Sequence, residues 1–307
     1  MNILLTGGAG FIGSHIADAY LASGHKVTII DNLSTGRRKN IPAGATFVEA
    51  DIRDPDAVRG VFTSSRFDLV NHHAAQMDIR RSVADPVYDA SVNILGVLTI
   101  LQEAVRAGVT RMVFASSGGA VYGEQTTFPA SESHATHPIS PYGVAKLTTE
   151  QYLFYYHTVF GLDVVCLRYA NVFGPRQNPE GEAGVVAIFA NKLFAGQHPI
   201  INGDGKQTRD YVFVSDIVRA NMLVSDARGF QVFNIGTGRE TDVNQIFHGV
   251  CAAVGSACTE RHGEAKKGEQ RRSVLSHERI RQAFGWTPGV TLEEGLRTTV
   301  EYFRKNQ

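Results

Sequence analysis

The stretch TGGAGFIG, residues 6–13, follows directly on an apolar run at residues 2–6 and decides which fold we expect. Three of its four glycines, Gly7, Gly10 and Gly13, have the G-x-x-G-x-x-G spacing of a turn that binds a dinucleotide. The first glycines let the backbone turn tightly and approach a pyrophosphate, and Gly13 lets the next helix pack closely on the strand. That helix offers free N–H groups and the positive end of its dipole to the phosphates. The dinucleotide contacts predicted here are Gly7, Gly10, Phe11, Ile12 and Gly13.

An acidic residue follows the second apolar run, residues 26–30. Asp31 lies roughly 20 residues beyond the glycine turn, where a carboxylate can hydrogen-bond the ribose hydroxyls of adenosine. Its charge would repel a 2′-phosphate, which favours NAD over NADP. The basic residues 37–39 could bind a phosphate, although a solvated loop is the simpler interpretation. At the end of the third run, Asp51 and Ile52 could flank adenine or form an ordinary turn. The adenosine contacts predicted are Asp31, Asn32, Asp51 and Ile52.

Short apolar runs alternate with longer segments of helical periodicity over the first half of the chain. The runs are nearly continuous, as in strands that are buried on both faces of a parallel sheet. They lie near residues 2–6, 26–30, 46–50, 68–72, 111–115 and 163–168. Between them, segments such as 84–107 and 141–160 carry apolar residues at helical spacing. The alternation predicts an α/β fold, a Rossmann-type doubly wound parallel sheet with right-handed crossovers.

The alternation of apolar runs and helical patterns gives way after about residue 172 to shorter elements that glycine and proline interrupt. We expect residues 1–172 to form an NAD-binding Rossmann domain. Residues 173–307 should form mainly a smaller, C-terminal substrate-binding lobe. The boundary is soft, because later segments can return to the first domain.

Composition narrows the classes of function. Thirty basic residues balance thirty acidic ones among 307, so nothing points to nucleic acid or to an anionic membrane as a partner. The N-terminus lacks a basic leader, and no apolar run is long enough to span a membrane. Cys166, Cys251 and Cys258 are an odd number without metal-ligand spacing, and we expect buried, reduced thiols. A reducing, cytoplasmic compartment fits this pattern, and we predict no metal site.

The segment SPYGVAK, residues 140–146, opens a long helical pattern. Tyr142 and Lys146 are four residues apart and therefore lie on one helical face. A tyrosine has a reference pKa of about 10, and a nearby ammonium favours the phenolate and lowers that pKa. The same lysine can hydrogen-bond the nicotinamide ribose. The pair comes one crossover after residues 114–117, a strand end at the carboxyl edge of the sheet, which favours a functional role.

Several stretches together resemble the extended short-chain dehydrogenase/reductase family, in its UDP-glucose 4-epimerase-like branch. They run from residue 1 to about residue 216, with a weaker match to Trp286. The matching stretches are TGGAGFIG, DNLSTG, HHAAQ, SSGGAVYG, SPYGVAK, LRYANVFGPRQ and RDYVFVSD. The resemblance implies an NAD-dependent enzyme that acts on a sugar nucleotide.

The resemblance also implies a mechanism. Tyr142 would remove the proton of the sugar 4-hydroxyl while hydride passes from C4 to bound NAD. The resulting 4-keto sugar would rotate about its link to the diphosphate and receive the hydride on its other face. By the same resemblance, Asn171 and Arg209 contact the substrate diphosphate, Ala74 and Gln76 line the cofactor, and Asn93 braces the sheet edge beside it.

Three positions depart from the family pattern. The position that usually holds Ser or Thr is Gly118, and Ser117 precedes it, so either Ser117 reaches the sugar from a shifted backbone or Tyr142 acts with less hydroxyl assistance. A late phosphate-binding Arg and an Asp correspond to Lys266 and Glu269. Ser273 corresponds to the position that limits room at the sugar 2-substituent. A small residue there predicts tolerance of UDP-N-acetylglucosamine as well as UDP-glucose.

Other functions remain open. A uronate epimerase or a decarboxylase shares most of these motifs, and a 4,6-dehydratase resembles a pattern with Asp-Glu where residues 119–120 are Gly-Ala. A non-catalytic dinucleotide sensor would not need both Tyr142 and Lys146, and an alcohol dehydrogenase with exchangeable NAD is a further alternative. Members of the family pair the helices that correspond to 84–107 and 141–160 as a four-helix bundle. We therefore expect a homodimer.

Overall fold

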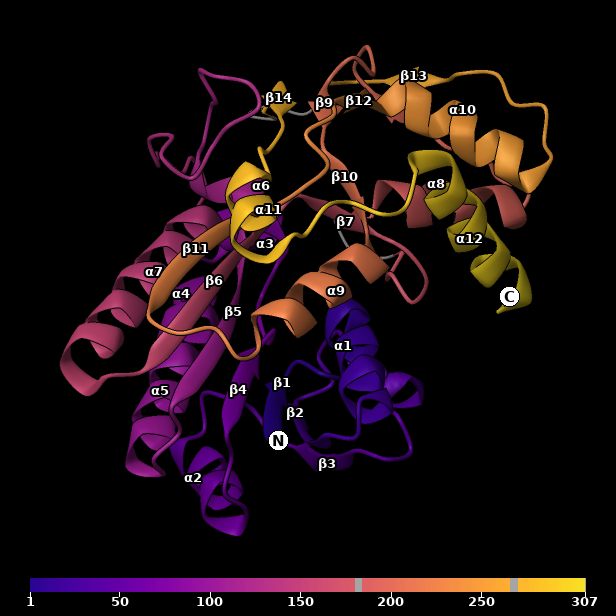
Figure 1. Cartoon of the computed structure of the whole chain (residues 1–307). Coiled ribbons are helices and arrows are strands. Elements are labelled where there is room, and N and C mark those ends of the chain that lie inside the picture. Colours follow the sequence, from indigo (N-terminus) through magenta and orange to yellow (C-terminus); the bar gives the residue numbers. More distant parts are fainter. Residues whose placement is uncertain (180–183, 266–269, 307) are drawn as a thin grey trace.

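Seven parallel strands form the central sheet of the computed structural model (Figure 1). The structure describes every residue except 180–183, 266–269 and 307. The strand order is β11-β6-β5-β4-β1-β2-β3. The strands are β1 Asn2–Thr6, β2 Lys26–Asp31, β3 Thr46–Glu49, β4 Leu69–His72, β5 Arg111–Ser117, β6 Asp163–Tyr169 and β11 Phe230–Ile235. Each of the six predicted runs forms one strand, and the predicted fold class is confirmed.

Helices cover both faces of this sheet. Side chains alternate along β1, so that Ile3 and Leu5 pack toward α1 (Phe11–Ala22) and α9 (Val214–Val224), whereas Leu4 packs into the core on the other face. That second core is closed by α2 (Pro55–Ser64), α5 (Gly96–Arg106) and α7 (Pro141–Phe160). Figure 1 shows α5 and α7 together on one side of the sheet and α1 with α9 on the other.

The helical segment before β5 is interrupted by a wider turn. It starts with α3 (Ile79–Ala84) and α4 (Pro86–Ala90), continues as a π-helical turn over Ser91–Leu95 and runs on as α5. A π turn inserts one residue into a helix and often marks a functional site. Asn93 lies inside it.

The later part of the chain builds a third core and also rejoins the sheet. This core lies between α8 (Val185–Phe194), α10 (Val243–Val254) and α12 (Leu292–Lys305). Short strands connect these helices with the sheet: β7 Asn171–Phe173, β8 Ile201–Asn202, β9 Thr208–Arg209, β10 Tyr211–Phe213, β12 Thr241–Asp242, β13 His262–Gly263 and β14 Arg272–Ser273. The remaining helices are η1 Arg38–Asn40, α6 Gly118–Val121 and α11 Glu278–Phe284. Although β11 lies far beyond residue 172, it pairs with β6 as the edge strand.

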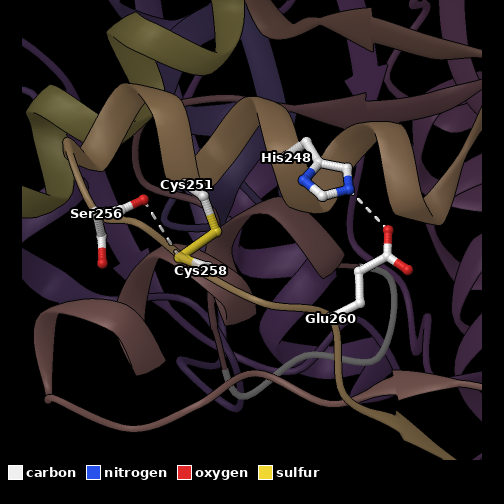
Figure 2. Close-up of a disulfide and its surroundings, with 5 residues drawn as sticks. All are labelled: His248, Cys251, Ser256, Cys258 and Glu260. Carbon is white, nitrogen blue, oxygen red and sulfur yellow. Dashed lines mark hydrogen bonds and ion pairs between the residues drawn. A yellow bond between two sulfur atoms is a disulfide. The ribbon is translucent and has the colours of Figure 1, made fainter.

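The prediction of reduced thiols is wrong for two of the three cysteines. Figure 2 shows a disulfide between Cys251, near the end of α10, and Cys258 in the following loop. The helix ends at Gly255, whose φ of 81° turns the chain back and brings the two Cα atoms to 6.1 Å. Cys166, in contrast, is free and buried in β6. The reversal at Gly255 is a feature of the folded chain that cysteine spacing alone does not reveal.

The structure offers no helix of sufficient length and apolarity to cross a membrane within residues 1–179, 184–265 and 270–306.

Candidate active site

The glycine turn joins β1 to α1 and leaves no room for side chains. Gly7 has a φ of 71°, and a Cβ on it would lie 2.6 Å from the backbone nitrogen of Ala74. A Cβ on Gly13 would lie 2.3 Å from the carbonyl oxygen of Gly7. Within the described part of the chain, no side chain caps the start of α1 at Gly10, and its first turn carries no acidic residue. Its N–H groups and helix dipole therefore suit a pyrophosphate, with Phe11 and Ile12 as the next residues of the turn.

The predicted adenosine contacts gather beyond β2. Asp31 accepts hydrogen bonds from the N–H groups of Ala9 (3.0 Å) and Leu33 (2.8 Å). Burial raises the pKa of its carboxyl group, and these two hydrogen bonds oppose that rise. Asn32 donates to Asp51 at 2.9 Å. Arg53 also binds Asp51 and holds the pKa of that carboxyl well below its usual range.

Two side chains near the predicted adenosine contacts pack against the protein itself. The side chain of Ile52 is buried, and a Cβ on Gly96 would lie 2.7 Å from its Cδ1 atom. Arg38 in the basic segment forms an ion pair with Glu49 and stacks over the ring of Phe47. The arrangement of Arg38 fits the solvated-loop interpretation of that segment.

The loop after β4 is tied to both the glycine turn and the π turn. The N–H of Ala74 donates to the Thr6 hydroxyl at 3.1 Å. The backbone of Gln76 makes two hydrogen bonds with the Asn93 side chain, one received by its carbonyl oxygen at 2.8 Å and one donated by its N–H at 3.0 Å. Thr149 of α7 donates to the Asn93 carbonyl at 2.9 Å. Asn93 thus braces this loop against two helices.

Tyr142 and Lys146 lie on one face of α7, with the Lys146 Nζ atom 5.7 Å from the centre of the Tyr142 ring. Lys146 is 3% exposed and donates to the Ala115 carbonyl at 2.9 Å. Ser117, the last residue of β5, lies close enough to Tyr142 to lower the pKa of its phenol. The structure therefore brings these three predicted residues together at the carboxyl edge of the sheet.

The pKa of Tyr142 differs from the expected direction. Burial raises the pKa of Tyr142 to about 12, and its interaction with Ser117 opposes that rise. We expected Lys146 to lower the pKa of the tyrosine, but desolvation is the larger effect here. Burial also lowers the pKa of Lys146 to about 8, which still leaves the ammonium mostly protonated at neutral pH.

Gly118 explains one departure from the family pattern. A Cβ at this position would lie 2.4 Å from the Cδ1 atom of Leu275, which is fully buried. The backbone of Leu275 is held in place, because its N–H donates to the Asp210 carboxylate at 3.2 Å. A serine at 118 would therefore collide with Leu275. The hydroxyl beside Tyr142 comes from Ser117 instead.

The predicted substrate contacts come from short strands of the later part of the chain. Ser273 in β14 pairs with Arg209 in β9, so the two residues are neighbours in that small sheet. The N–H of Asn171 donates to the carbonyl of Asp210, the residue after Arg209, at 2.9 Å. Ser273 is only 2% exposed. The other two predicted contacts, Lys266 and Glu269, lie outside the described residues.

Sequence reasoning missed two residues that the structure adds to this region. The Asp89 carboxylate in α4 accepts hydrogen bonds from the side chains of Gln76 and Asn93, each at 2.9 Å. Thr149 joins Asn93 to α7, as described above. Asp89 precedes Asn93 by four residues, and this spacing on a predicted helix was the available signal.

The two adjacent histidines at the end of β4 have structural partners. His72 is hydrogen-bonded to the Thr6 hydroxyl at 2.9 Å, and His73 to the Tyr169 hydroxyl at 3.0 Å. Burial lowers the pKa of both rings, that of His73 to about 3, so both are neutral at pH 7. Among the described residues, His, Cys, Asp and Glu form no group of three that could hold a metal ion.

Comparisons with known proteins agree with this geometry. Residues 3–236 match the model of the NAD dependent epimerase/dehydratase family. A UDP-glucose 4-epimerase of Thermotoga maritima, solved with UDP-glucose, is 47% identical with a TM-score of 0.98, over 100% of this chain and 99% of its own. A Thermus thermophilus UDP-glucose 4-epimerase, solved with NAD, is 43% identical with a TM-score of 0.95, over 99% of both chains.

A third structure extends the range of substrates among the relatives. It is a UDP-N-acetylglucosamine 4-epimerase of Methanobrevibacter ruminantium, solved with UDP-N-acetylmuramic acid. It is 34% identical with a TM-score of 0.94, and the match covers 100% of this chain and 99% of that one. These findings confirm the family, the fold and the cofactor that the sequence predicts. The chain belongs to the NAD dependent epimerase/dehydratase family.

Proposed function

We propose that the protein is a UDP-hexose 4-epimerase that uses bound NAD and proceeds through a 4-keto sugar. The observation that carries the proposal is the meeting of Ser117, Tyr142 and Lys146 at the carboxyl edge of the sheet. A hydroxyl, a phenol and an ammonium are the groups needed to move a proton at a sugar hydroxyl. The similarity to UDP-glucose 4-epimerases over almost the whole chain supports the same reaction.

The glycine turn fits a dinucleotide, because its glycines leave the backbone open and the start of α1 has no side-chain cap among the described residues. Asp31 fits the ribose of adenosine, Ala74 and Gln76 would line the cofactor, and Asn93 would brace the loop beside it. When bound, NAD supplies a reversible hydride acceptor and a positive charge that favours the phenolate.

Tyr142 holds or releases the proton of the sugar 4-hydroxyl in this proposal. Ser117 would keep the phenol oriented by a hydrogen bond and would stabilise the phenolate, because this residue lowers the pKa of Tyr142 against the effect of burial. Lys146 is fixed by the Ala115 carbonyl, with its charge directed to the same region. Of the two alternatives at this position, the proposal takes the one in which Ser117 supplies the hydroxyl.

The substrate would be held mainly by residues 173–307, which we propose as the substrate-binding lobe on the NAD-binding domain of residues 1–172. Arg209 suits a diphosphate, because a guanidinium is always charged and can make two parallel bonds. Asn171, Lys266 and Glu269 complete the proposed contacts. Since Ser273 is small, we propose that the enzyme accepts UDP-N-acetylglucosamine as well as UDP-glucose.

We also propose a homodimer that pairs the segments 84–107 and 141–160 as a four-helix bundle. Apolar side chains on these segments are exposed to solvent in the single chain, and burying them against a second copy would be favourable. They include Val87, Leu95, Val144, Tyr152, Tyr155 and Val159. Light scattering should give the mass of two chains. A cytoplasmic location stays a prediction, and the disulfide removes one of its arguments.

Proton NMR of the purified protein, without added NAD, tests the proposed reaction. UDP-glucose and UDP-N-acetylglucosamine are incubated separately, and the galacto anomeric signal should appear in both. A Tyr142→Phe variant is the matched control and should give no signal with either sugar. If the wild-type protein converts neither sugar even with NAD supplied, the proposal is wrong and uronate or dehydratase chemistry, or a non-catalytic dinucleotide sensor, takes its place.

A further inference from the structure

Asp89 is a buried carboxylate that none of the proposed steps uses. It lies in α4 and is 1% exposed. Its Oδ1 atom accepts hydrogen bonds from Gln76 Nε2 and Asn93 Nδ2, both at 2.9 Å. Its Oδ2 atom is buried and has no hydrogen-bond partner among the described residues. A buried carboxylate is unfavourable unless an opposite charge compensates it.

A buried cation, Lys146, lies on the helix that packs against the helix of Asp89. The helix of Asp89 packs against α7, which carries Lys146, and the attraction between the two charges opposes the burial of both groups. The two helices are also joined by hydrogen bonds, because Asn93 binds Asp89 on one side and receives the Thr149 hydroxyl of α7 on the other. Thr149 lies one turn beyond Lys146 on the same helix.

The other charges near Lys146 are already compensated or absent. Glu150 is in a two-point ion pair with Arg168, at 2.6 and 3.0 Å, and also accepts the Ser116 hydroxyl. His72 and His73 face Lys146 from the end of β4, but burial keeps both rings neutral. Among the described residues, Asp89 and Glu150 are the carboxylates whose charges raise the pKa of Lys146, and Glu150 already has Arg168 as its ion-pair partner.

We propose that Asp89 is the counterion of Lys146 and a positioning residue that sets the charge state of the Tyr142–Lys146 pair. The inference rests on the proposed function, in which this pair moves the proton. A negative charge at Asp89 favours the ammonium of Lys146 and disfavours the phenolate of Tyr142. The carboxylate therefore keeps Lys146 charged at neutral pH and delays the loss of the tyrosine proton.

An Asp89→Asn substitution separates this role from a structural one, because the amide keeps the shape and can accept the same hydrogen bonds. Without the charge, the pKa values of Lys146 and of Tyr142 should both fall by about one pH unit. A purely structural role predicts lower stability with both pKa values unchanged. Glu103→Gln is the matched control, since Glu103 is a buried carboxylate of the neighbouring α5 that is paired with Arg106.

The measurement is a carbon-13 NMR titration of the purified protein with its bound NAD. Labels at lysine Cε and tyrosine Cζ report the two pKa values, and Lys146→Arg and Tyr142→Phe assign the signals. Both signals should titrate at lower pH in Asp89→Asn and at unchanged pH in Glu103→Gln. Unchanged titration in Asp89→Asn would overturn the proposal.

Two further readouts keep the test decisive. The titration needs no turnover, so it gives an answer even if the protein fails to epimerise either sugar, and the two proposals can fail separately. If Asp89→Asn does not fold, the wild-type signal of Lys146 should show a second, acidic step where Asp89 gains its proton. Its absence would also overturn the proposal. In an active protein, the fall of kcat at alkaline pH should begin at a lower pH in Asp89→Asn, following the lower pKa of Lys146.

Discussion

The contact between Gly118 and Leu275 can be tested by adding a single methyl group. A Cβ at position 118 would lie 2.4 Å from Leu275 Cδ1, closer than two carbons can approach. Leu275 is fully buried, so it cannot turn away into solvent. Overpacking of this kind costs ~1–3 kcal/mol, and we expect Gly118→Ala to lower the free energy of unfolding by that amount. Gly119→Ala is the control, because its Cβ would be 3.8 Å from its nearest neighbour.

A double-mutant cycle separates the steric contact from other effects at Gly118. Leu275→Ala alone should cost ~2–5 kcal/mol, because it leaves a cavity in the core. In the double variant the new methyl group meets no δ-carbons of residue 275. The loss of unfolding free energy in this variant should therefore be smaller than the sum of the losses in the two single variants by ~1–2 kcal/mol. Urea unfolding at equilibrium measures all four proteins. Strict additivity, or a Gly118→Ala variant as stable as Gly119→Ala, would refute the reasoning.

Three further predictions concern other parts of the molecule. Ser117→Ala should raise the pKa of Tyr142 further and lower kcat about tenfold or more at pH 7, since a hydrogen bond to a phenolate contributes ~1.5–3 kcal/mol. An unchanged pH–rate profile would contradict this expectation. The pKa of His73 is about 3 in the fold against 6.5 unfolded, so its contribution to stability is full above pH 6.5 and falls by ~1.4 kcal/mol per unit of pH below it; urea unfolding at several pH values should give a slope smaller by that amount in His73→Phe, where His72 keeps its own contribution. Cys258→Ser should cost up to ~2.5 kcal/mol in unfolding free energy, because the bond to Cys251 closes a short loop, and a reductant should change the wild-type protein but not the variant.

The elements of the sheet could be predicted from the sequence because their signals are local. Six nearly continuous apolar runs give the strands in their observed positions. The seventh strand, β11, was not among them. Its burial pattern is intermediate over its first half, as expected at a sheet edge, and its partner β6 lies more than 60 residues earlier in the chain. A pairing of that kind depends on tertiary packing, which local periodicity does not report.

The candidate site divides in the same way. The four-residue spacing of Tyr142 and Lys146 gives their common face, but the direction of the Tyr142 pKa depends on burial by neighbours from other elements. Similarly, Gly118 stands out as a departure in the sequence, whereas its cause is a leucine 157 positions later. Spacing identifies which residues share a helical face, but it does not report how strongly that face is shielded from solvent.

The π turn at Ser91–Leu95 limits how this protein can change length over evolution. Each residue of a helix turns the chain by about 100°, so deleting one residue from the turn would rotate everything beyond it by that angle. The Asn93 side chain would then lose its hydrogen bonds with Gln76, or Leu95 would turn away from the solvent-exposed side of the segment on which Val87 is also exposed. Substitutions can accumulate along this helix one at a time. An insertion or deletion would disturb its inner and outer faces together, so related chains should keep its length fixed while their loops vary.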